Sequence, residues 1–185
     1  MGSISLYLKQ FVLAPRTTGT VLPSSRYLCE KMLQDVDWEN ITEVVELGAG
    51  DGILTKKILE KMRPDAVLKS FEIRPEFVEK LRTINDNRLT ICDYSAEFLN
   101  GDCDVIFSCV PLVVLPKKVS IKILKSCVNS LRLKNGLFIQ FHYSRLCEKL
   151  ISRYFSFKRH YVFRNIPPAF VYKCSIKLSK DKKIL

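Results

Sequence analysis

Residues 44–53 read VVELGAGDGI, and this stretch decides the fold because an apolar run passes directly into a glycine turn and then into a helical pattern. Glycine at positions 48, 50 and 52 lets the backbone turn sharply and approach a ligand without a β-carbon in the way. The first N–H groups of the following helix have no partner within that helix. The stretch therefore predicts a strand, a ligand-binding loop and a helix, in that order.

The glycine spacing indicates which kind of ligand the loop binds. A dinucleotide pyrophosphate is typically bound by G-x-G-x-x-G, whereas this loop reads G-x-G-x-G and carries Glu46 two residues before its first glycine. A carboxylate there would repel a phosphate, but it suits a ligand with an α-amino group and a sulfonium cation. The loop therefore favours S-adenosylmethionine over NAD.

Two further carboxylates follow successive predicted strands. Glu72 ends the second strand, where it can accept hydrogen bonds from ribose hydroxyls, and Asp93 follows the third, where it can meet the adenine amino group. Taken singly, Glu46 could be a strand-edge charge, Glu72 an ion-pair partner and Asp93 a helix cap. Their order on three successive strand ends favours a cofactor site, whose other predicted members are Gly48, Ala49, Gly50, Gly52, Ile73, Tyr94 and Ser108.

From residue 43 onward, short apolar runs alternate with longer amphipathic segments, which is typical of a parallel sheet covered by helices. The strands are predicted at 43–47, 66–72, 89–92, 105–108 and 136–143, with an antiparallel hairpin formed by 158–164 and 169–178. Helices are predicted at 24–38, 53–61, 75–85, 118–131 and 146–154. The fold class is therefore α/β and Rossmann-like, a seven-stranded, mostly parallel sheet with helices on both faces.

Length and composition limit the organisation of the chain. At 185 residues and 47% hydrophobic, it can bury one core, and we expect a single domain over residues 1–185. The seven cysteines form no C-x-x-C pair, so we expect thiols buried in the core and no metal site. No apolar run is long enough to span a bilayer, and the start of the chain lacks the features of a secretory signal.

The chain is strongly basic. Thirty Lys and Arg against 19 Asp and Glu give a formal charge of +11, which favours attraction to nucleic acid or to an anionic lipid surface without choosing between them. A solvated surface rich in lysine would give the same count. Residues 1–14 place Ile4, Tyr7, Leu8 and Phe11 on one helical face, which predicts an amphipathic helix at a membrane interface or packed on the protein itself.

Several segments resemble the bacterial class I phospholipid N-methyltransferases, relatives of the ribosomal RNA adenine dimethyltransferases. Residues 108–112, SCVPL, are similar to the S-G-L-P-L loop of that family, and 138–143, FIQFHY, to its F-I-Q-F-T-Y strand. Residues 164–169, RNIPPA, resemble its N-x-P-P-A turn. The resemblance runs from about Thr20 to Tyr172, although Asp51 stands where threonine is commoner. It implies a class I methyltransferase fold with S-adenosylmethionine as cofactor and phosphatidylethanolamine, with its methylated intermediates, as substrate.

The same resemblance separates a lipid from an adenine substrate. The ribosomal enzymes usually carry N-L-P-Y after the fourth strand, where the aromatic ring stacks on the flipped adenine. Leu112 has no ring, and the helical domain by which those enzymes grip RNA is not present in this sequence. We therefore expect a phospholipid N-methyltransferase peripheral to the cytoplasmic face of the cell membrane, with an anionic membrane surface rather than nucleic acid as partner. An RNA (adenine-N6) methyltransferase-like enzyme and a binding protein without turnover are the alternatives.

Methyl transfer to an amine needs an unprotonated nucleophile held in line with the sulfonium methyl, so polar side chains near that point are the catalytic candidates. Tyr143 and His142 end the fifth strand, and Tyr27 lies on the first predicted helix. Adjacent strand residues point to opposite faces, so we favour Tyr143 with Tyr27 as its partner, and a structural role for His142. The substrate-binding candidates are Pro111, Leu112, Arg164 and Asn165; the last two could instead stabilise the hairpin.

Overall fold

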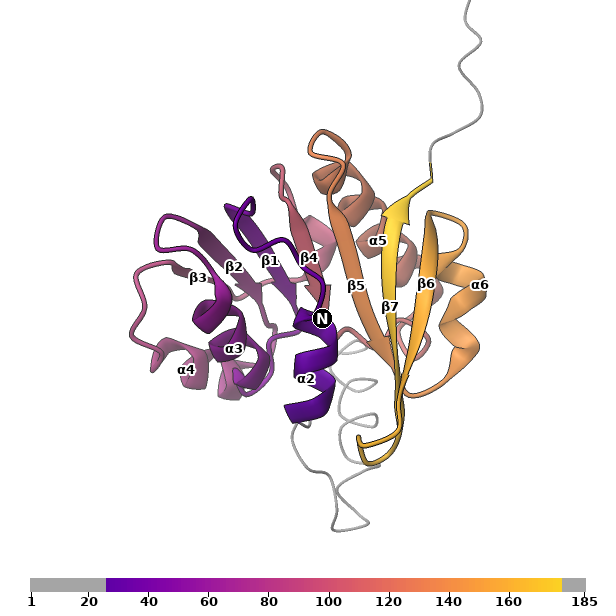
Figure 1. Ribbon diagram of the computed structural model, residues 1–185, viewed down its shortest axis with the longest axis horizontal. Helices are drawn as coiled ribbons and strands as arrows, with labels where there is room; N and C mark the ends of the chain where they lie inside the picture. The colour runs from indigo at the N-terminus through magenta and orange to yellow at the C-terminus, as the bar shows by residue number, and fades with distance from the viewer. Residues whose placement is uncertain (1–25, 178–185) are drawn as a thin grey trace, which may run out of the picture.

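The computed structural model describes residues 26–177, in which seven strands form one sheet in the order β3-β2-β1-β4-β5-β7-β6 (Figure 1). The strands are β1 (Glu43–Leu47), β2 (Val67–Phe71), β3 (Leu89–Cys92), β4 (Val105–Ser108), β5 (Leu137–His142), β6 (Phe155–Val162) and β7 (Ala169–Ile176). The helices are α2 (Arg26–Leu33), α3 (Ile53–Lys61), α4 (Pro75–Arg82), α5 (Lys117–Arg132) and α6 (Glu148–Ile151), with short 3-10 turns η1 (Ala96–Phe98) and η2 (Arg145–Cys147).

The first five strands are parallel, because each is reached from the one before it by a crossover that returns the chain to the same end of the sheet. β7 runs antiparallel to both β5 and β6, so the carboxyl-terminal hairpin closes the sheet. The predicted α/β architecture, its seven strands and its antiparallel hairpin are confirmed. Four elements, β1, β3, β4 and α3, have the predicted bounds.

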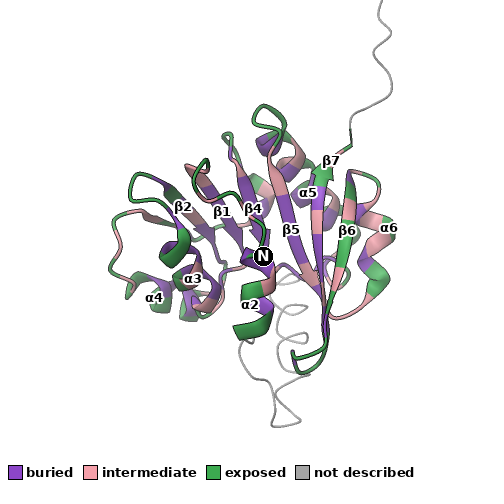
Figure 2. Ribbon diagram, viewed as in Figure 1, coloured by how far each residue is buried: buried purple, intermediate pink, exposed green. Residues whose placement is uncertain are grey.

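Two apolar layers cover the sheet, and both are buried (Figure 2). On one face α2 and α3 pack against the strands through side chains such as Leu28 and Ile58, with α4 beside α3 (Figure 1). On the other face α5 and α6 pack through side chains such as Leu124 and Ile151. Burial of large apolar side chains on both faces explains the nearly continuous apolar runs of the central strands.

Two predicted helices differ most from the structure; in addition, α4 ends at Arg82 rather than at residue 85, and β6 spans Phe155–Val162 rather than 158–164. The segment predicted as a helix over 24–38 is helical only over Arg26–Leu33, because Asp35 adopts a positive φ of 61° that ends the helix. Lys173 on β7 holds Asp35 there through a 2.8 Å ion pair. The segment predicted over 146–154 divides into η2 and α6.

The amphipathic helix predicted for residues 1–14 lies outside the described residues, as do the first two positions of the helix predicted at 24–38. Over residues 26–177, none of the helices has the length and apolar character needed to cross a bilayer.

Candidate functional site

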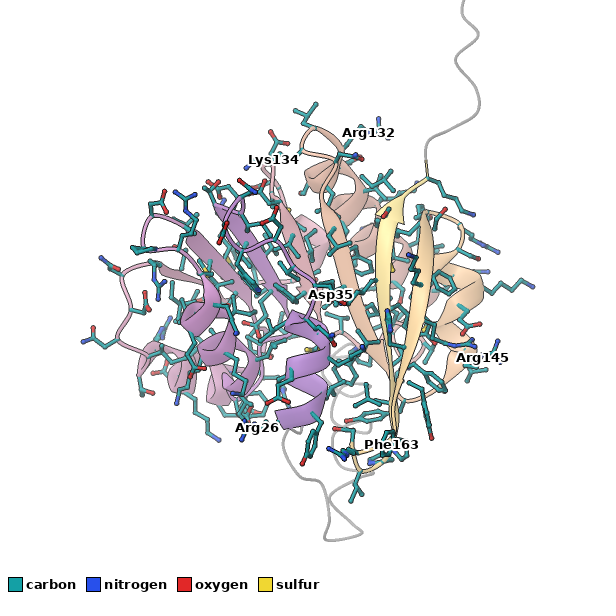
Figure 3. All side chains as sticks on the ribbon, in the orientation of Figure 1. Arg26, Asp35, Arg132, Lys134, Arg145 and Phe163 are labelled. Carbon is teal, nitrogen blue, oxygen red and sulfur yellow. The ribbon has the colours of Figure 1, made fainter. Side chains whose placement is uncertain are left out.

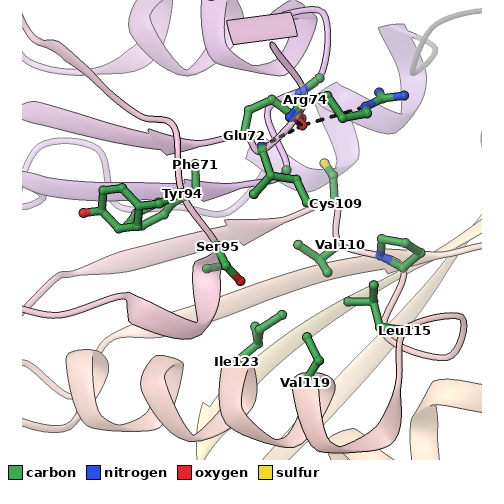
Figure 4. Close-up of a pocket in the computed structure, with 15 residues that line it drawn as sticks. Phe71, Glu72, Arg74, Tyr94, Ser95, Cys109, Val110, Leu115, Val119 and Ile123 are labelled. Atoms are coloured by element: carbon green, nitrogen blue, oxygen red, sulfur yellow. Dashed lines mark hydrogen bonds and ion pairs between the residues drawn. The ribbon is translucent and has the colours of Figure 1, made fainter. Parts of the chain in front are cut away.

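A pocket opens where the strand order reverses, at the carboxyl ends of β1 and β4, which is where open α/β sheets bind ligands. The loops after β1, β2, β3 and β4 supply most of its wall, and α5 closes one side (Figure 4). The lining residues are Gly48, Gly50, Phe71, Glu72, Ile73, Arg74, Tyr94, Ser95, Ala96, Cys109, Val110, Pro111, Leu115, Val119 and Ile123.

The glycine loop is fixed to the neighbouring strand by its backbone. The amides of Gly48 and Ala49 both donate to the carbonyl of Phe71, at 2.8 and 3.1 Å. Gly50 has a φ of 57°, and a β-carbon built on it would have no atom within 4 Å. Because Gly50 lines the pocket, its missing side chain leaves space for a ligand close to the backbone.

Glu72 is the carboxylate that the structure places in the pocket wall. Its Oε2 accepts the amide of Gly50 at 2.8 Å, and its Oε1 accepts the amides of Ile73 and Arg74 at 2.9 Å each. Arg74 approaches the same Oε1 with its Nε at 3.8 Å. The carboxylate is thus held between the glycine loop and the residues that follow β2 (Figure 4).

Glu46 occupies a different position from the one expected of a ligand-facing carboxylate. It is fully buried and is not among the lining residues; its Oε2 accepts hydrogen bonds from Thr55 Oγ1 on α3 and Ser70 Oγ on β2, both at 2.7 Å. Oε1 has no partner among residues 26–177. Burial raises the pKa of Glu46 to about 7, against the lowering effect of the two hydroxyls. The group therefore titrates near neutrality.

Of the three residues around Asp93 and the end of β2 that were predicted to meet the adenosine part of the cofactor, two line the pocket and one does not. Ile73 and Tyr94 line the pocket, and Tyr94 packs edge-on against Phe71 with 5.4 Å between ring centroids. Asp93 points elsewhere, since its side chain is 62% exposed and lies 3.6 Å from the guanidinium of Arg82. Ser95 and Ala96, which follow Tyr94 in the sequence, line the pocket wall where the sequence analysis had placed Asp93.

The loop after β4 forms the opposite wall. Cys109, Val110 and Pro111 line the pocket, whereas Leu112 is buried in the core at 2% exposure and Ser108 is fully buried beneath the loop. Leu112 is therefore not placed to contact a substrate, which corrects its predicted role. Burial holds the pKa of the Cys109 thiol well above its usual value, so this thiol is not ionised.

Gln140 fixes that loop to β5 and was given no role in the sequence analysis. Its buried Nε2 donates to the carbonyl of Val110 at 3.1 Å and to that of Phe141 at 2.7 Å. A buried amide with two such bonds sets the orientation of the pocket-lining Val110 peptide. The FIQFHY pattern placed Gln140 on the strand, but the sequence alone does not identify the carbonyl groups to which its side-chain amide donates.

The catalytic candidates lie near the same edge of the sheet without lining the pocket. Tyr143 is half-buried, packs edge-on against Phe141 and shares a side-chain hydrogen bond with Asn165; burial raises its pKa. Tyr27 instead lies under the guanidinium of Arg164, 5.3 Å from its ring centroid. The contacts thus pair Tyr143 with Asn165 and Tyr27 with Arg164, rather than Tyr143 with Tyr27.

His142 is 4% exposed, and neither ring nitrogen has a partner among residues 26–177. Burial lowers its pKa to about 4, so the imidazole is neutral at physiological pH.

The pocket residues missed by the sequence analysis are mainly apolar. Leu115, Val119 and Ile123 lie on or just before α5, whose apolar stripe also supplies the core residues Leu124 and Cys127. Core and pocket walls need the same side chains, so the helical periodicity could not separate them.

The cysteines were expected in the core, and six of the seven are buried there. Cys109 is the exception, because it is half-buried in the pocket wall.

Solved structures similar to this one include methyltransferases. The N-methyltransferase NodS from Bradyrhizobium japonicum WM9, in complex with S-adenosyl-l-homocysteine, matches with a TM-score of 0.68 at 11% identity, covering 85% of this chain and 91% of that one. The 1,6-didemethyltoxoflavin-N1-methyltransferase of Burkholderia thailandensis matches with a TM-score of 0.72 at 14% identity, covering 94% and 89%. The fold is therefore that of the Rossmann-like class I methyltransferases.

The family follows from the sequence. Residues 24–139 match the family model described as ribosomal RNA adenine dimethylase, and the chain belongs to this family. It is also similar to the ornithine lipid N-methyltransferase of Singulisphaera acidiphila, with 28% identity over 191 residues that cover 94% of this chain and 96% of that protein.

Proposed function

We propose that this protein is an S-adenosylmethionine-dependent N-methyltransferase that methylates the amine of a membrane lipid. The observation that carries the lipid substrate is the similarity to an ornithine lipid N-methyltransferase, which extends over nearly the whole of both chains. The amine of phosphatidylethanolamine or of its methylated intermediates, expected from the sequence resemblance, and the amine of an ornithine lipid are the two substrate candidates. Both kinds of substrate carry an amine on a lipid held at a bilayer surface.

The residues of the pocket fit S-adenosylmethionine. Glu72 offers carboxylate oxygens to ribose hydroxyls, and the open space beside Gly50 admits a ligand close to the loop backbone. The apolar wall formed by Ile73, Tyr94 and Ile123 suits a purine ring. When bound, the cofactor supplies an activated methyl group on a sulfonium centre. Glu46 lies behind the glycine loop, fully buried and outside the pocket lining, so the pocket as it stands offers Glu72 rather than Glu46 to the cofactor.

The acceptor side is formed by the loop after β4 and the end of β5. The amine must arrive without its extra proton, because only the lone pair can attack the methyl carbon. Gln140 holds the Val110 peptide in a fixed orientation at the pocket wall, and we assign Tyr143, fixed by Asn165, to orienting the substrate head group. The raised pKa of Tyr143 keeps its hydroxyl protonated, so it acts as a hydrogen-bond partner rather than as a base.

Methylation of RNA adenine is the second candidate, because the family is described by that activity. It needs an aromatic ring after the fourth strand to stack on the flipped base. The residue at that position, Leu112, has no ring and is 2% exposed, with its carbonyl bonded to Ser120 Oγ at 2.7 Å. The structure thus supports the lipid candidate over the adenine candidate.

The test is methyl transfer from labelled S-adenosylmethionine by the full chain, offered separately to anionic vesicles containing phosphatidylethanolamine, to vesicles containing ornithine lipid, and to mixed cellular RNA. We expect label in one or both lipid phases and none in RNA. Tyr143→Phe is expected to bind the cofactor normally and to lower kcat about tenfold, a loss of about 1.4 kcal/mol of transition-state stabilisation. Tyr27→Phe, which removes the same hydroxyl from the other tyrosine, is the matched control and is expected to lower kcat less. Label in RNA alone would contradict the lipid assignment.

A further inference from the structure

The turn that joins β6 to β7 carries an exposed apolar surface. Phe163 is 68% exposed and Ile166 is 61% exposed, and the two prolines that follow are exposed as well. Asn165, by contrast, is 3% exposed: its Nδ2 donates to the Pro167 carbonyl at 2.6 Å, and its amide donates to the Val162 carbonyl at 3.3 Å. The turn is thus held from inside while its apolar side chains face outward. We call Phe163, Arg164, Ile166, Pro167 and Pro168 the hairpin tip.

The hairpin tip lies at the edge of the sheet that carries the pocket. β7 begins at Ala169 and pairs Phe170 with His142, the last residue of β5, so the turn extends past the carboxyl end of β5. Arg164 stacks over Tyr27, at the start of α2, which is itself 46% exposed. In Figure 3, Phe163 and Arg26 lie toward this edge, while Arg132 and Lys134 lie at the opposite one.

The segment around the hairpin tip carries basic side chains and no acidic ones. Residues 149–177 contain no Asp or Glu, and their seven cationic side chains are Lys149, Arg153, Lys158, Arg159, Arg164, Lys173 and Lys177. Arg164 lies in the tip itself, and the hairpin carries no carboxylate that would repel an anionic partner. An exposed apolar patch with such a cation is complementary to an anionic lipid surface, where apolar groups enter the interface and cations remain at the level of the phosphates.

We infer that the hairpin tip docks on an anionic lipid bilayer, with Phe163 and Ile166 inserted among the head groups and Arg164 bound to lipid phosphate. This inference rests on the proposed function, since it gives the route by which a bilayer-held amine reaches the pocket edge. RNA is the less favoured occupant, because Phe163 is the single aromatic side chain of the tip, and Ile166 and the two prolines offer no further face on which a base could stack. The docked orientation turns the carboxyl edge of the sheet, and with it the pocket, toward the membrane.

The test is vesicle binding by the full chain. Phe163→Trp is expected to show blue-shifted tryptophan emission, quenched by brominated lipid, with vesicles that contain phosphatidylglycerol. Leu133→Trp is the matched control, because Leu133 is 79% exposed and follows α5 at the opposite edge of the sheet; its emission is expected not to change. The double variant Phe163→Ser/Ile166→Ser is expected to bind these vesicles at least tenfold more weakly than Leu133→Ser does.

Equal binding by the double variant and the Leu133 variant would overturn the inference, as would tip-dependent binding to RNA but not to vesicles. If the double variant has the same midpoint of thermal unfolding as the wild type, any loss of vesicle binding is not caused by misfolding. Methyl transfer to substrate dispersed in detergent separates this inference from the proposed function. If the wild-type chain binds vesicles through the tip but methylates lipid neither in vesicles nor in detergent, the proposed function fails and the docking surface stands. If lipid is methylated while the tip variants bind vesicles normally, the docking surface fails and the proposed function stands.

Discussion

The amide of Gly50 donates a 2.8 Å hydrogen bond to Oε2 of Glu72, which joins the loop after β1 to the residue that follows β2. This bond unites the two sequence features from which a cofactor site was predicted, the glycine loop and the second carboxylate. It leaves Glu72 in the pocket wall while fixing the direction of its carboxylate. Three backbone amides hold that carboxylate, so its position does not depend on a flexible side-chain partner.

Replacing Glu72 by Gln should weaken cofactor binding. An amide presents one acceptor oxygen and an NH2 group that faces backbone N–H donors, so the site loses both its charge and its fixed geometry. We expect the Kd for S-adenosylmethionine, measured by calorimetry, to rise by about tenfold or more, equivalent to about 1.4 kcal/mol. Glu76→Gln, in the exposed first turn of α4, is the matched control and should leave the Kd unchanged.

Two glycines of the same loop should separate cofactor binding from stability. Gly50→Ala places a methyl group in open pocket space, at a backbone strain of about 1–2 kcal/mol, and should chiefly weaken cofactor binding. Gly52→Ala carries the same kind of strain and also brings its β-carbon within 3.1 Å of Leu81 and Ile84, so it should lower the free energy of unfolding more. Denaturant unfolding together with calorimetry checks both; equal effects of the two variants on both quantities would contradict the assignment.

The buried carboxyl of Glu46 should make stability fall as pH rises. Its folded-state pKa of about 7 lies above the ordinary value of 4.5, so between these pH values the folded state binds more protons than the unfolded state. The resulting loss reaches about 3 kcal/mol at most. Glu46→Gln cannot ionise, so the difference in unfolding free energy between the variant and the wild type should grow in favour of the variant from pH 4.5 to 7. A difference that is constant with pH would show that Glu46 is not protonated when buried.

His142 should contribute the opposite slope. Its folded-state pKa of about 4 lies below the ordinary value of 6.5, so the stability present above pH 6.5 is lost as the pH falls toward 4. The windows of the two groups overlap, so the wild-type curve alone is flatter than either effect. His142→Gln should remove the acid-dependent loss, of up to about 3 kcal/mol, when its urea unfolding is compared with wild type at successive pH values. If both proteins lose stability equally in acid, the imidazole is not the responsible group.

Local patterns predicted the sheet well because each strand is a short apolar run bounded by turn residues. The bounds of β1 and α3 were predicted to the residue, since the succession of strand, glycine turn and helix is a local property of residues 43–61. Asp35 shows where this fails: it has a positive φ just after α2, and its carboxylate pairs with Lys173 on β7, a residue far away in the sequence.

The site was predicted less completely, for the same reason. Glu72 and Gly50 were correctly assigned to one pocket, because the carboxyl ends of adjacent parallel strands meet at one edge. Which way Glu46 and Asp93 point depends on Thr55, Ser70 and Arg82, whose positions only the folded chain fixes. The wall supplied by α5 carried no separate signal, since an apolar pocket and an apolar core need the same residues.

The most direct test of the central claim is mass spectrometry of lipid and RNA recovered after incubating the full chain with S-adenosylmethionine and both substrates in one vessel. We predict an amine lipid heavier by one CH2 per methyl group added, absent with Glu72→Gln at limiting cofactor, and unmodified adenine in the RNA. Methylated adenine together with unchanged lipid would contradict the assignment and return the protein to the base-modifying activity for which its family is described.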